Sequence, residues 1–370
     1  DSLRWVLIDC VTPLGAGERR SLSVEFGSSI SRAAIPDALR TDTLADTVRV
    51  ITGPMQIDTA AAPFRIAQGV WIDGNGDGAF AEAERIASSA GAELIDADAS
   101  LFTAGAATMR VELAGPLKTV LRFEGPYVDG TGRELFRHIT RLSFVAGSTT
   151  IGVSHTLVDT HLETEFHDIT SLSLPLALTG GPAATATYLC DAGDPLEFSS
   201  LRPPAQTAPR ECALADGAAR LAQLTDDAWS LRTGDRVLAE GKRTCGAVDY
   251  AAADGSGITV AVTDFWQRYP KALAASGDRL DIQLLPAIPD SDTYAGLPWQ
   301  LGFPFVGGKY RFKWGMSTTD RVNVTFRPPG STADVAAAGQ GVGGRAVERR
   351  AHPQGQAETH QRRNRPDPLH

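Results

Sequence analysis

The sequence predicts an all-β protein whose main part is a large antiparallel two-sheet β-sandwich. Many segments alternate between apolar and polar residues with a period of two, as strands with one buried face do. No segment shows the period of a convincing long amphipathic helix. The 370 residues include 37 glycines and 22 prolines, and only 21% of them are charged, which is typical of a turn-rich β protein.

The predicted sandwich spans residues 46–327. In the strand at 109–113 we expect Met109, Val111 and Leu113 to point inward, because residues of one parity share a face of a strand. So many strands in one span favour two facing sheets over a small barrel. The main predicted strands are 109–113, 119–124, 138–145, 151–158, 169–178, 229–232, 258–264, 280–285, 310–314 and 322–326.

The two ends of the chain differ from the sandwich. Residues 3–9 and 21–26 alternate cleanly, and the charged turn between them predicts the closing hairpin of a preceding domain. Ser, Pro and Asp break the pattern over 28–46, so we place a domain boundary there, and the first part is residues 1–45. Residues 328–370 hold no Phe, Trp or Tyr. They cannot bury enough surface to offset the entropy of ordering, so we expect a disordered tail, of frameshifted or vector-derived origin.

The charge of the chain limits its partners. The formal net charge is −9 and the pI is about 5.3, so nucleic acid and anionic membranes are disfavoured because the protein's field would repel phosphate. An acidic polysaccharide would have to meet a locally basic groove. No run approaches the roughly 18 apolar residues of a membrane span, and no signal peptide stands at the start. Asp1 is therefore interpreted as the edge of a fragment or of a processed form.

The four cysteines show no metal-binding spacing. Cys212 and Cys245 flank a loop-rich region and would pair in an exported protein, with Cys190 as a rival partner. Cys10 is interpreted as a buried thiol on a strand, and four thiols in a reducing compartment are the alternative. Residues 191–227 are rich in Pro, Ala and Arg and poorly patterned, which predicts a long surface excursion.

The most specific local motif is DGNGDGAFAEAE at residues 73–84, which satisfies the twelve-position pattern of a calcium-binding loop. Asp73, Asn75 and Asp77 supply oxygens at the first, third and fifth positions, and Glu84 at the last can bind Ca²⁺ through both oxygens. The loop follows a strand-like segment instead of a helix. We predict a structural calcium site in a β context, and an acidic, glycine-rich turn that binds nothing is the alternative.

The stretch from 257 to 286 is the one around which we expect the sandwich to be organised. Two alternating segments, 258–262 and 280–284, are joined by DFWQRYPK at 264–271. This connection is longer than a hairpin needs, and its aromatic rings would be costly to leave in water. The rings either cover the sheet as a plug or form one wall of a sugar-binding groove.

The histidines are weaker signals. His155 has the same parity as Ile151, Val153 and Leu157, so it is either a core residue with a hydrogen bond or a catalytic group. HLETEFHD at 161–168 gathers histidines and carboxylates without a zinc-binding spacing. The sequence has no GxSxG nucleophile motif and no phosphate loop that follows a strand. Its Asp and Glu residues are too many to select a pair for glycoside hydrolysis.

Several segments, taken in order, carry a family resemblance. They are LRWVLIDCVTPLGAGERRSLSVEFG, VITGPMQIDT, VWIDGNGDG, VELAGPLKTVLRFEG, RLSFVAGSTTIGVSHTLVD, HDITSLSLPL and VAVTDFWQRYPKAL. Together they resemble the exo-acting rhamnogalacturonan lyase and YetA-like proteins, over roughly residues 1–326. The family has an N-terminal RIFT barrel, a central β-sandwich and a C-terminal α/α toroid. Only the last strands of the barrel are present, the tail stands where the toroid would follow, and WGMSTTDRVNVTF replaces a segment that carries Lys in relatives.

The resemblance implies a fragment of a secreted or periplasmic polysaccharide lyase-like protein that lacks its toroid partner. β-Elimination at a uronic acid needs a cation to neutralise the carboxylate and a base to remove the C5 proton. His155, Arg268, Tyr269 and Lys271 have these chemical types, so we name them as catalytic candidates, with an acidic polysaccharide or oligosaccharide as the partner. The alternative function is a non-catalytic carbohydrate-binding or scaffolding β-sandwich.

Overall fold

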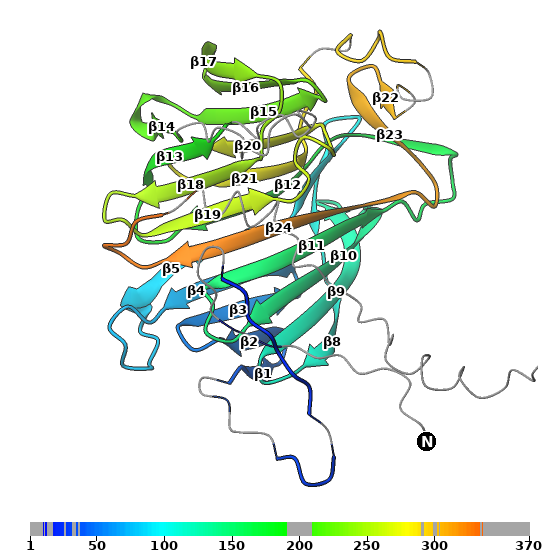
Figure 1. Ribbon diagram of the computed structural model, residues 1–370. Helices are drawn as coiled ribbons and strands as arrows, with labels where there is room; N and C mark the ends of the chain where they lie inside the picture. The colour runs from blue at the N-terminus through cyan, green and yellow to red at the C-terminus, as the bar shows by residue number, and fades with distance from the viewer. Residues whose placement is uncertain are drawn as a thin grey trace, which may run out of the picture.

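The structure, a computed structural model, contains 24 β-strands and two short 3₁₀ helices, η1 (Glu82–Glu84) and η2 (Leu214–Asp216), within the described residues. The strands form one network of antiparallel pairs, so the all-β prediction is confirmed (Figure 1). The residues described are 10, 12, 18–25, 27–31, 35, 38–190, 209–289, 292–298, 302, 304–333 and 335.

Nine strands form one layer of the sandwich, which we call layer one. Each strand is paired with the next in space. In spatial order they are β14 (Arg210–Ala213), β13 (Ala183–Leu189), β18 (Ala247–Ala252), β19 (Gly257–Val262), β24 (Ser317–Arg327), β11 (Thr150–Val158), β10 (Glu134–Val145), β9 (Lys118–Asp129) and β8 (Thr108–Ala114).

Eleven further strands form layer two, and each is again paired with the next in space. They are β17 (Arg236–Gly241), β16 (Ala228–Thr233), β15 (Ala219–Thr225), β20 (Lys271–Ala275), β21 (Leu280–Leu285), β12 (Phe166–Leu178), β5 (Arg85–Ser88), β4 (Phe64–Ile72), β3 (Met55–Ala61), β2 (Thr47–Ile51) and β1 (Arg40–Leu44). Two short strands, β6 (Glu93–Asp96) and β7 (Leu101–Ala104), connect the layers, since β6 pairs with β12 and β7 with β9. A small hairpin of β22 (Phe305–Val306) and β23 (Lys309–Lys313) extends the start of β12.

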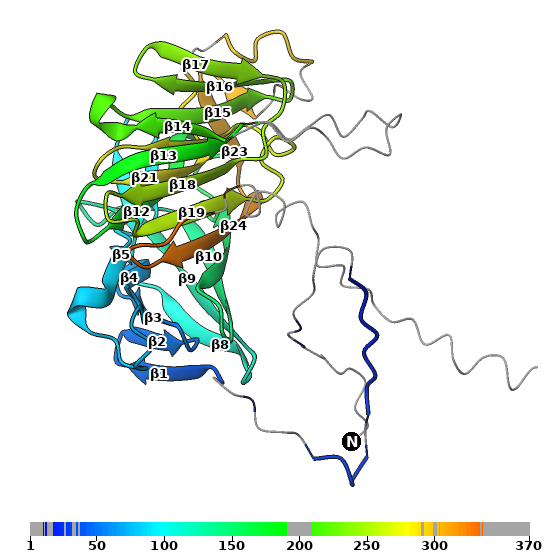
Figure 2. The ribbon, with the colours of Figure 1, turned by 60° about the vertical axis from the view of Figure 1, so that its left-hand side comes forward.

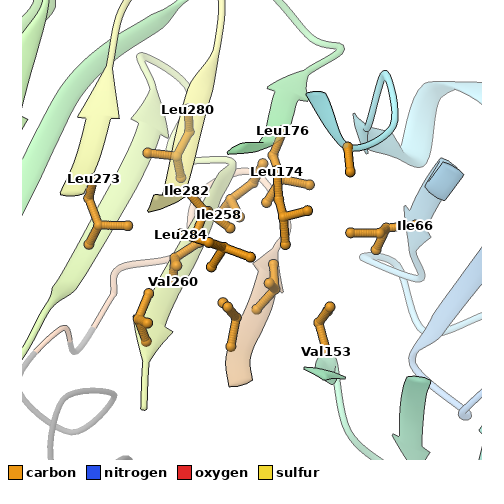
Figure 3. Packing of buried hydrophobic residues seen from close by; sticks show 14 of the residues in the cluster. Ile66, Val153, Leu174, Leu176, Ile258, Val260, Leu273, Leu280, Ile282 and Leu284 are labelled. Atoms are coloured by element: carbon orange, nitrogen blue, oxygen red, sulfur yellow. The ribbon is translucent and has the colours of Figure 1, made fainter. Parts of the chain in front are cut away.

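The core lies between the two layers and is built by the predicted alternation. Leu280, Ile282 and Leu284 of β21 lie across from Ile258 and Val260 of β19, and all five are at most 2% exposed (Figure 3). Each buried aliphatic side chain contributes about 1.5–3 kcal/mol through removal of its surface from water. One buried cluster of this kind extends through strands of both layers.

The segments 258–262 and 280–284 do not form one hairpin, so that expectation is wrong. β19 pairs with β18 and β24 in layer one, whereas β21 pairs with β20 and β12 in layer two. The connection is long because it crosses from one layer to the other and then forms β20. This strand is not among those predicted from the sequence. Figure 2 shows β19 and β21 as separate strands of the two layers.

The expectation that Met109, Val111 and Leu113 point inward is also corrected. Val111 is 43% exposed, and Met109 and Leu113 are only partly buried. β8 is an edge strand that pairs only with β9 among the described strands, so the other layer covers it incompletely. In the 310–314 segment, Tyr310 and Phe312 are buried, but Trp314 lies beyond the end of β23 and is exposed.

At the amino end, the predicted strand at 21–26 is wrong for the residues that are described. Residues 18–25 are exposed and have no regular secondary structure, because a single hairpin without neighbouring strands cannot bury side chains such as Leu22 and Val24. Residues 3–9 lie outside the described residues. The sheet begins with β1 at Arg40, before the predicted boundary at residue 46.

Order continues past the predicted start of the tail at residue 328. The Gly330 amide donates a hydrogen bond to the Asp254 carbonyl at 2.7 Å, and Val335 packs on Leu189 and Ala247 of layer one. Residues 336–370, on which the disorder prediction mainly falls, lie outside the described residues.

The excursion predicted for 191–227 is shorter than expected. β14 and β15 lie inside that span, and β15 is an inner strand of layer two whose Ala219 and Leu221 are fully buried. Residues 191–208 lie outside the described residues.

Candidate functional site

Three of the four predicted catalytic residues gather around one buried carboxylate, Asp320 of β24. Arg268 Nε donates a hydrogen bond to Asp320 Oδ1 at 3.1 Å, and Lys271 Nζ lies 3.2 Å from the same oxygen. His155 of β11 is the direct cross-strand neighbour of Asp320. The crossing connection delivers both cations because Arg268 ends its turn and Lys271 begins β20.

This cluster runs from the surface into the space between the layers. The Arg268 side chain is 40% exposed, whereas the side chains of Lys271 and Asp320 are 3% and 2% exposed. Arg268 also donates a hydrogen bond from Nη2 to Thr318 Oγ1, and Lys271 donates one to the Leu284 carbonyl at 2.7 Å. Burial lowers the pKa of Lys271, and the charge of Asp320 opposes that shift. The ammonium can stay charged in the interior only because Asp320 is next to it.

His155 continues the polar network deeper into layer one. Its Nε2 lies 2.7 Å from the Tyr127 hydroxyl, and its Nδ1 lies 2.8 Å from Thr140 Oγ1. The same Thr140 oxygen is 3.1 Å from Nδ1 of His138, and the His138 ring stacks on Phe64 of layer two with centroids 4.7 Å apart. The network therefore links the two histidines through one hydroxyl group.

The two histidines resist protonation. Burial lowers the pKa of His155 to about 4, and the charge of Asp320 opposes this shift only in part. Burial, with the repulsion of His155 and Arg137, lowers the pKa of His138 to about 3. Near neutral pH both imidazoles are therefore uncharged, as a hydrogen-bonded interior requires. This arrangement matches the core interpretation of His155 more closely than the catalytic one.

Tyr269 does not join the cluster. Burial raises its pKa, and the nearby charges of Asp226 and Asp227 act in the same direction. Tyr269 is partly buried, and its hydroxyl is near enough to Tyr294 to raise the pKa of that residue further, after burial.

The aromatic residues of the crossing connection differ in burial. Phe265 is 1% exposed and packs over Gly246, where a Cβ atom would lie 2.1 Å from the ring. Gly246 also has φ +68°, which favours glycine, so Phe265 serves as a plug. Trp266 is partly buried, and the Arg243 guanidinium lies 4.3 Å from its ring centroid. Trp266 is thus partly accessible and belongs to the same turn as Arg268.

The predicted calcium loop forms a compact acidic turn. Asp73 accepts hydrogen bonds from the amides of Gly76 and Gly78, at 2.7 and 2.9 Å, and Glu84 accepts them from Gly74 and Ala81. The oxygen donors suit Ca²⁺ in kind. Across the described parts of the chain, no group of three or more His, Cys, Asp or Glu side chains is arranged to hold a metal. Calcium at Asp73, Asn75, Asp77 and Glu84 stays a prediction.

If the loop binds calcium, millimolar Ca²⁺ is expected to raise the melting temperature by several degrees relative to a chelator. Binding at about 100 times Kd stabilises the folded state by roughly 2.7 kcal/mol. Asp77→Ala should abolish the difference, and Asp235→Ala, at an exposed turn outside the loop, should leave it intact. Equal melting curves of the wild-type protein in chelator and in calcium would rule out the site.

His167 in the segment 161–168 makes a side-chain contact with Asp159 that the sequence did not single out. His167 Nδ1 lies 2.9 Å from Asp159 Oδ2, and Thr164 Oγ1 lies 2.9 Å from the other ring nitrogen. Asp159 is fully buried at the end of β11. Residues 162–165 are exposed and have no strand or helix, as expected of a solvated loop, and β12 begins at Phe166.

The cysteines are thiols in the structure, so it does not contain the predicted Cys212–Cys245 disulfide. Cys212 belongs to the core cluster between the layers, whereas Cys245 packs with the smaller cluster that contains Val335 on the outer face of layer one. The two side chains face opposite sides of the same layer. Burial raises the pKa of the Cys212 thiol.

The alternating pattern of β24 could have revealed Asp320, which is not among the site residues predicted from the sequence. It shares parity with Val322, Val324 and Phe326, so a carboxylate on the buried face of β24 requires a cation. His138 and Thr140 could have been found in the same way, from their parity with Leu142 and Phe144 on β10.

The fold and this cluster define a two-layer antiparallel β-sandwich protein with a buried, charged network that opens at one end through Arg268. Residues 40–179 match the family model described as the PcRGLX-like protein central beta sandwich domain. The match agrees with the family resemblance of the sequence and covers His155 and the predicted calcium loop, but neither Arg268 nor Lys271. No curated protein matches the chain.

Solved structures with similar folds share little sequence with this chain. A galactose mutarotase-like protein from Clostridium acetobutylicum is 10% identical, with 79% of this chain and 99% of that chain covered and a TM-score of 0.41. The galactosidase domain of alpha-galactosidase-sucrose kinase is also 10% identical, with 79% of this chain and 42% of that chain covered and a TM-score of 0.45. The GH36 alpha-galactosidase AgaB from Geobacillus stearothermophilus is 9% identical, with 79% of this chain and 41% of that chain covered and a TM-score of 0.41. In the described part of this chain, no helix has the length and apolar character to span a membrane.

Proposed function

We propose that this chain is the β-sandwich part of a polysaccharide lyase-like protein that acts on uronate-containing glycans such as rhamnogalacturonan. The observation that carries the proposal is the Arg268 guanidinium, which is held by Asp320 and Thr318 and remains 40% exposed. A fixed, accessible cation of this kind can neutralise a uronate carboxylate, which β-elimination requires. The match of residues 40–179 to the PcRGLX-like central sandwich supports a carbohydrate-related role.

The remaining candidates have supporting roles in this proposal. Lys271 and His155 are 3% and 1% exposed, so they position Asp320 and Arg268 from within the sandwich and do not reach a polymer at the surface. The base would come from a further domain, for which the resemblance implies an α/α toroid. The narrower YetA-like assignment, the RIFT barrel at the amino end and a secreted or periplasmic location belong to the same proposal.

The second candidate function is a non-catalytic carbohydrate-binding or scaffolding β-sandwich. The burial of Lys271 and His155 favours it, because neither group is accessible as a base. Incubation of the protein with rhamnogalacturonan separates the two functions, with ultraviolet absorbance reporting the unsaturated product and a pull-down reporting glycan binding. Binding without a rise in absorbance would select the module.

Arg268→Ala is expected to weaken binding of rhamnogalacturonan about tenfold, since one charge-assisted contact corresponds to roughly 1.4 kcal/mol. Affinity measured by titration checks this result. Arg321→Ala is the matched control, because Arg321 is exposed on β24, on the face opposite to that of Asp320. Trp266→Ala should also weaken binding while the protein stays folded. Unchanged affinity of Arg268→Ala would refute the proposed contact.

A further inference from the structure

A second positively charged site lies away from Asp320, on the outer face of layer two. Arg220 of β15 stands directly opposite Arg232 of β16. Its neighbours in the strand, Ala219 and Leu221, are fully buried toward the core, so the Arg220 side chain points to the outer face. Two like charges in directly opposed positions of an antiparallel pair repel each other and destabilise the sheet.

No carboxylate offsets this repulsion among the described residues. The one hydrogen bond that the structure gives the Arg220 side chain joins Nε to Gln283 Oε1 of β21, at 3.2 Å. Elsewhere the arrangement is different, because Arg49, Arg311 and Arg327 each donate two hydrogen bonds to one carboxylate. Within the described residues, neither Nη group of Arg220 donates a hydrogen bond to another side chain or to the main chain.

Arg220 is also partly removed from water. It is only partly exposed, and burial lowers its pKa, with the charge of Arg232 acting in the same direction. A half-buried cation without a counter-charge is unfavourable in the free protein. An anion that receives the two Nη groups would remove this cost, since the planar guanidinium fits a carboxylate through two parallel hydrogen bonds.

Aromatic side chains from the segment after β21 lie on the Arg220 side of this arginine pair. Burial raises the pKa of Tyr310 and the charge of Arg220 opposes that shift, while the Tyr310 hydroxyl donates a hydrogen bond to the Pro286 carbonyl at 2.6 Å. Phe305 lies with its ring centroid 5.9 Å from that of Tyr310 and stacks on Tyr294 at 4.0 Å. The Tyr294 hydroxyl in turn is anchored on the Leu224 carbonyl of β15. Tyr310 and Tyr294 are 3% and 5% exposed, so these rings close one side of the Arg220 environment and leave the binding to the polar groups.

We propose that Arg220, with Arg232 and Gln283, forms a binding site for the carboxylate of a sugar acid. The carboxylate follows from the geometry of the arginine pair and does not depend on the proposed function. The choice of a sugar acid as the source of that carboxylate rests on the proposed function. This site is separate from the Arg268 mouth, which lies at the crossing between the layers.

Titration calorimetry of the full chain with trigalacturonate, at low salt, tests the site. In the Arg268→Ala background, which removes the mouth site, one binding event should remain. Adding Arg220→Gln should weaken that event at least tenfold, and adding Arg232→Gln should weaken it severalfold. Arg236→Gln, an exposed position on the neighbouring strand, is the matched control and should change the affinity less than twofold. Neutral trigalactose should not bind, and acetate should compete only weakly.

A stability measurement guards against a purely structural arginine. Because Arg220 has no counter-charge, Arg220→Gln should keep or raise the melting temperature, whereas a structural arginine would lower it by several degrees. Equal trigalacturonate binding by Arg268→Ala with and without Arg220→Gln, or equal binding of neutral trigalactose, would overturn this site and leave the proposed function standing. Loss of all uronate binding in Arg268→Ala alone would overturn it in the same way. Absence of uronate binding by the wild-type protein would overturn both.

Discussion

Replacing Asp320 with alanine is expected to lower the free energy of unfolding by about 3–5 kcal/mol. The carboxylate is 2% exposed and is the charge that compensates Lys271, which is 3% exposed. Its removal leaves an ammonium group in the interior with the Leu284 carbonyl as its hydrogen-bond acceptor. The cost of that unpaired charge exceeds the lost contact itself, which explains the size of the effect.

The pH dependence of the Asp320→Ala variant follows from the same lysine. The folded-state pKa of Lys271 lies below its ordinary value of 10.5. Between the two pKa values the unfolded chain binds more protons, so the variant should regain stability as the pH rises toward 10.5. Urea unfolding at pH 7.5 and at pH 10 measures the gain.

Two comparisons make the Asp320 result specific. Lys271→Met combined with Asp320→Ala should recover most of the loss, because it removes the buried charge together with its partner. Glu112→Gln breaks the hydrogen-bonded pair with Arg141 at the surface and should cost less than about 1 kcal/mol. A loss below 1 kcal/mol in Asp320→Ala would show that water reaches Lys271.

Acid is expected to destabilise the protein through His138 and His155. Their folded-state pKa values are about 3 and about 4, against 6.5 in an unfolded chain. A lowered pKa means that the stabilisation is fully present above pH 6.5 and is lost as the pH falls toward the folded-state value. By pH 4 each histidine should remove about 3 kcal/mol from the free energy of unfolding.

Urea unfolding between pH 7.5 and pH 4 tests the acid effect. Carboxylates contribute to the same curve, so the comparison with His138→Phe is decisive. Phenylalanine keeps the stacking on Phe64 and cannot be protonated, so this variant should lose about 3 kcal/mol less than the wild type over that range. His161→Gln should follow the wild-type curve, since His161 lies outside the buried network. Parallel curves for wild type and His138→Phe would contradict the assignment.

The sequence predicted many of the strands because their residues alternate between a buried and a more exposed face. The alternation in 151–158 and 280–285 reports burial directly, and both segments are strands. It could not show which strands pair, because parity carries no information about the partner. The segments 258–262 and 280–284 therefore looked like one hairpin, although they lie in different layers.

The candidate site was predicted only in part for a related reason. Chemical type and nearness in sequence selected Arg268 and Lys271, and the structure brings both to one oxygen atom. That oxygen belongs to Asp320, some 50 residues away along the chain, and only the pairing of β24 with β11 and β19 places it there. Tyr269, chosen by the same criteria, has Asp226 and Asp227 as its charged neighbours instead of Asp320.

The strand partners of β11 and β12 show that the region matched by the family model is smaller than the region that must fold together. The matched region ends at residue 179, yet β11 is hydrogen-bonded along its length to β24, and β12 to β21 and β23. A polypeptide that ends at that point would expose the unpaired backbone edges of β11 and β12 and the leucine side chains of β12. Such edges promote aggregation. Autonomous folding thus requires chain far beyond the recognisable module, and a recombinant design that transplants residues 40–179 must carry the later strands with it.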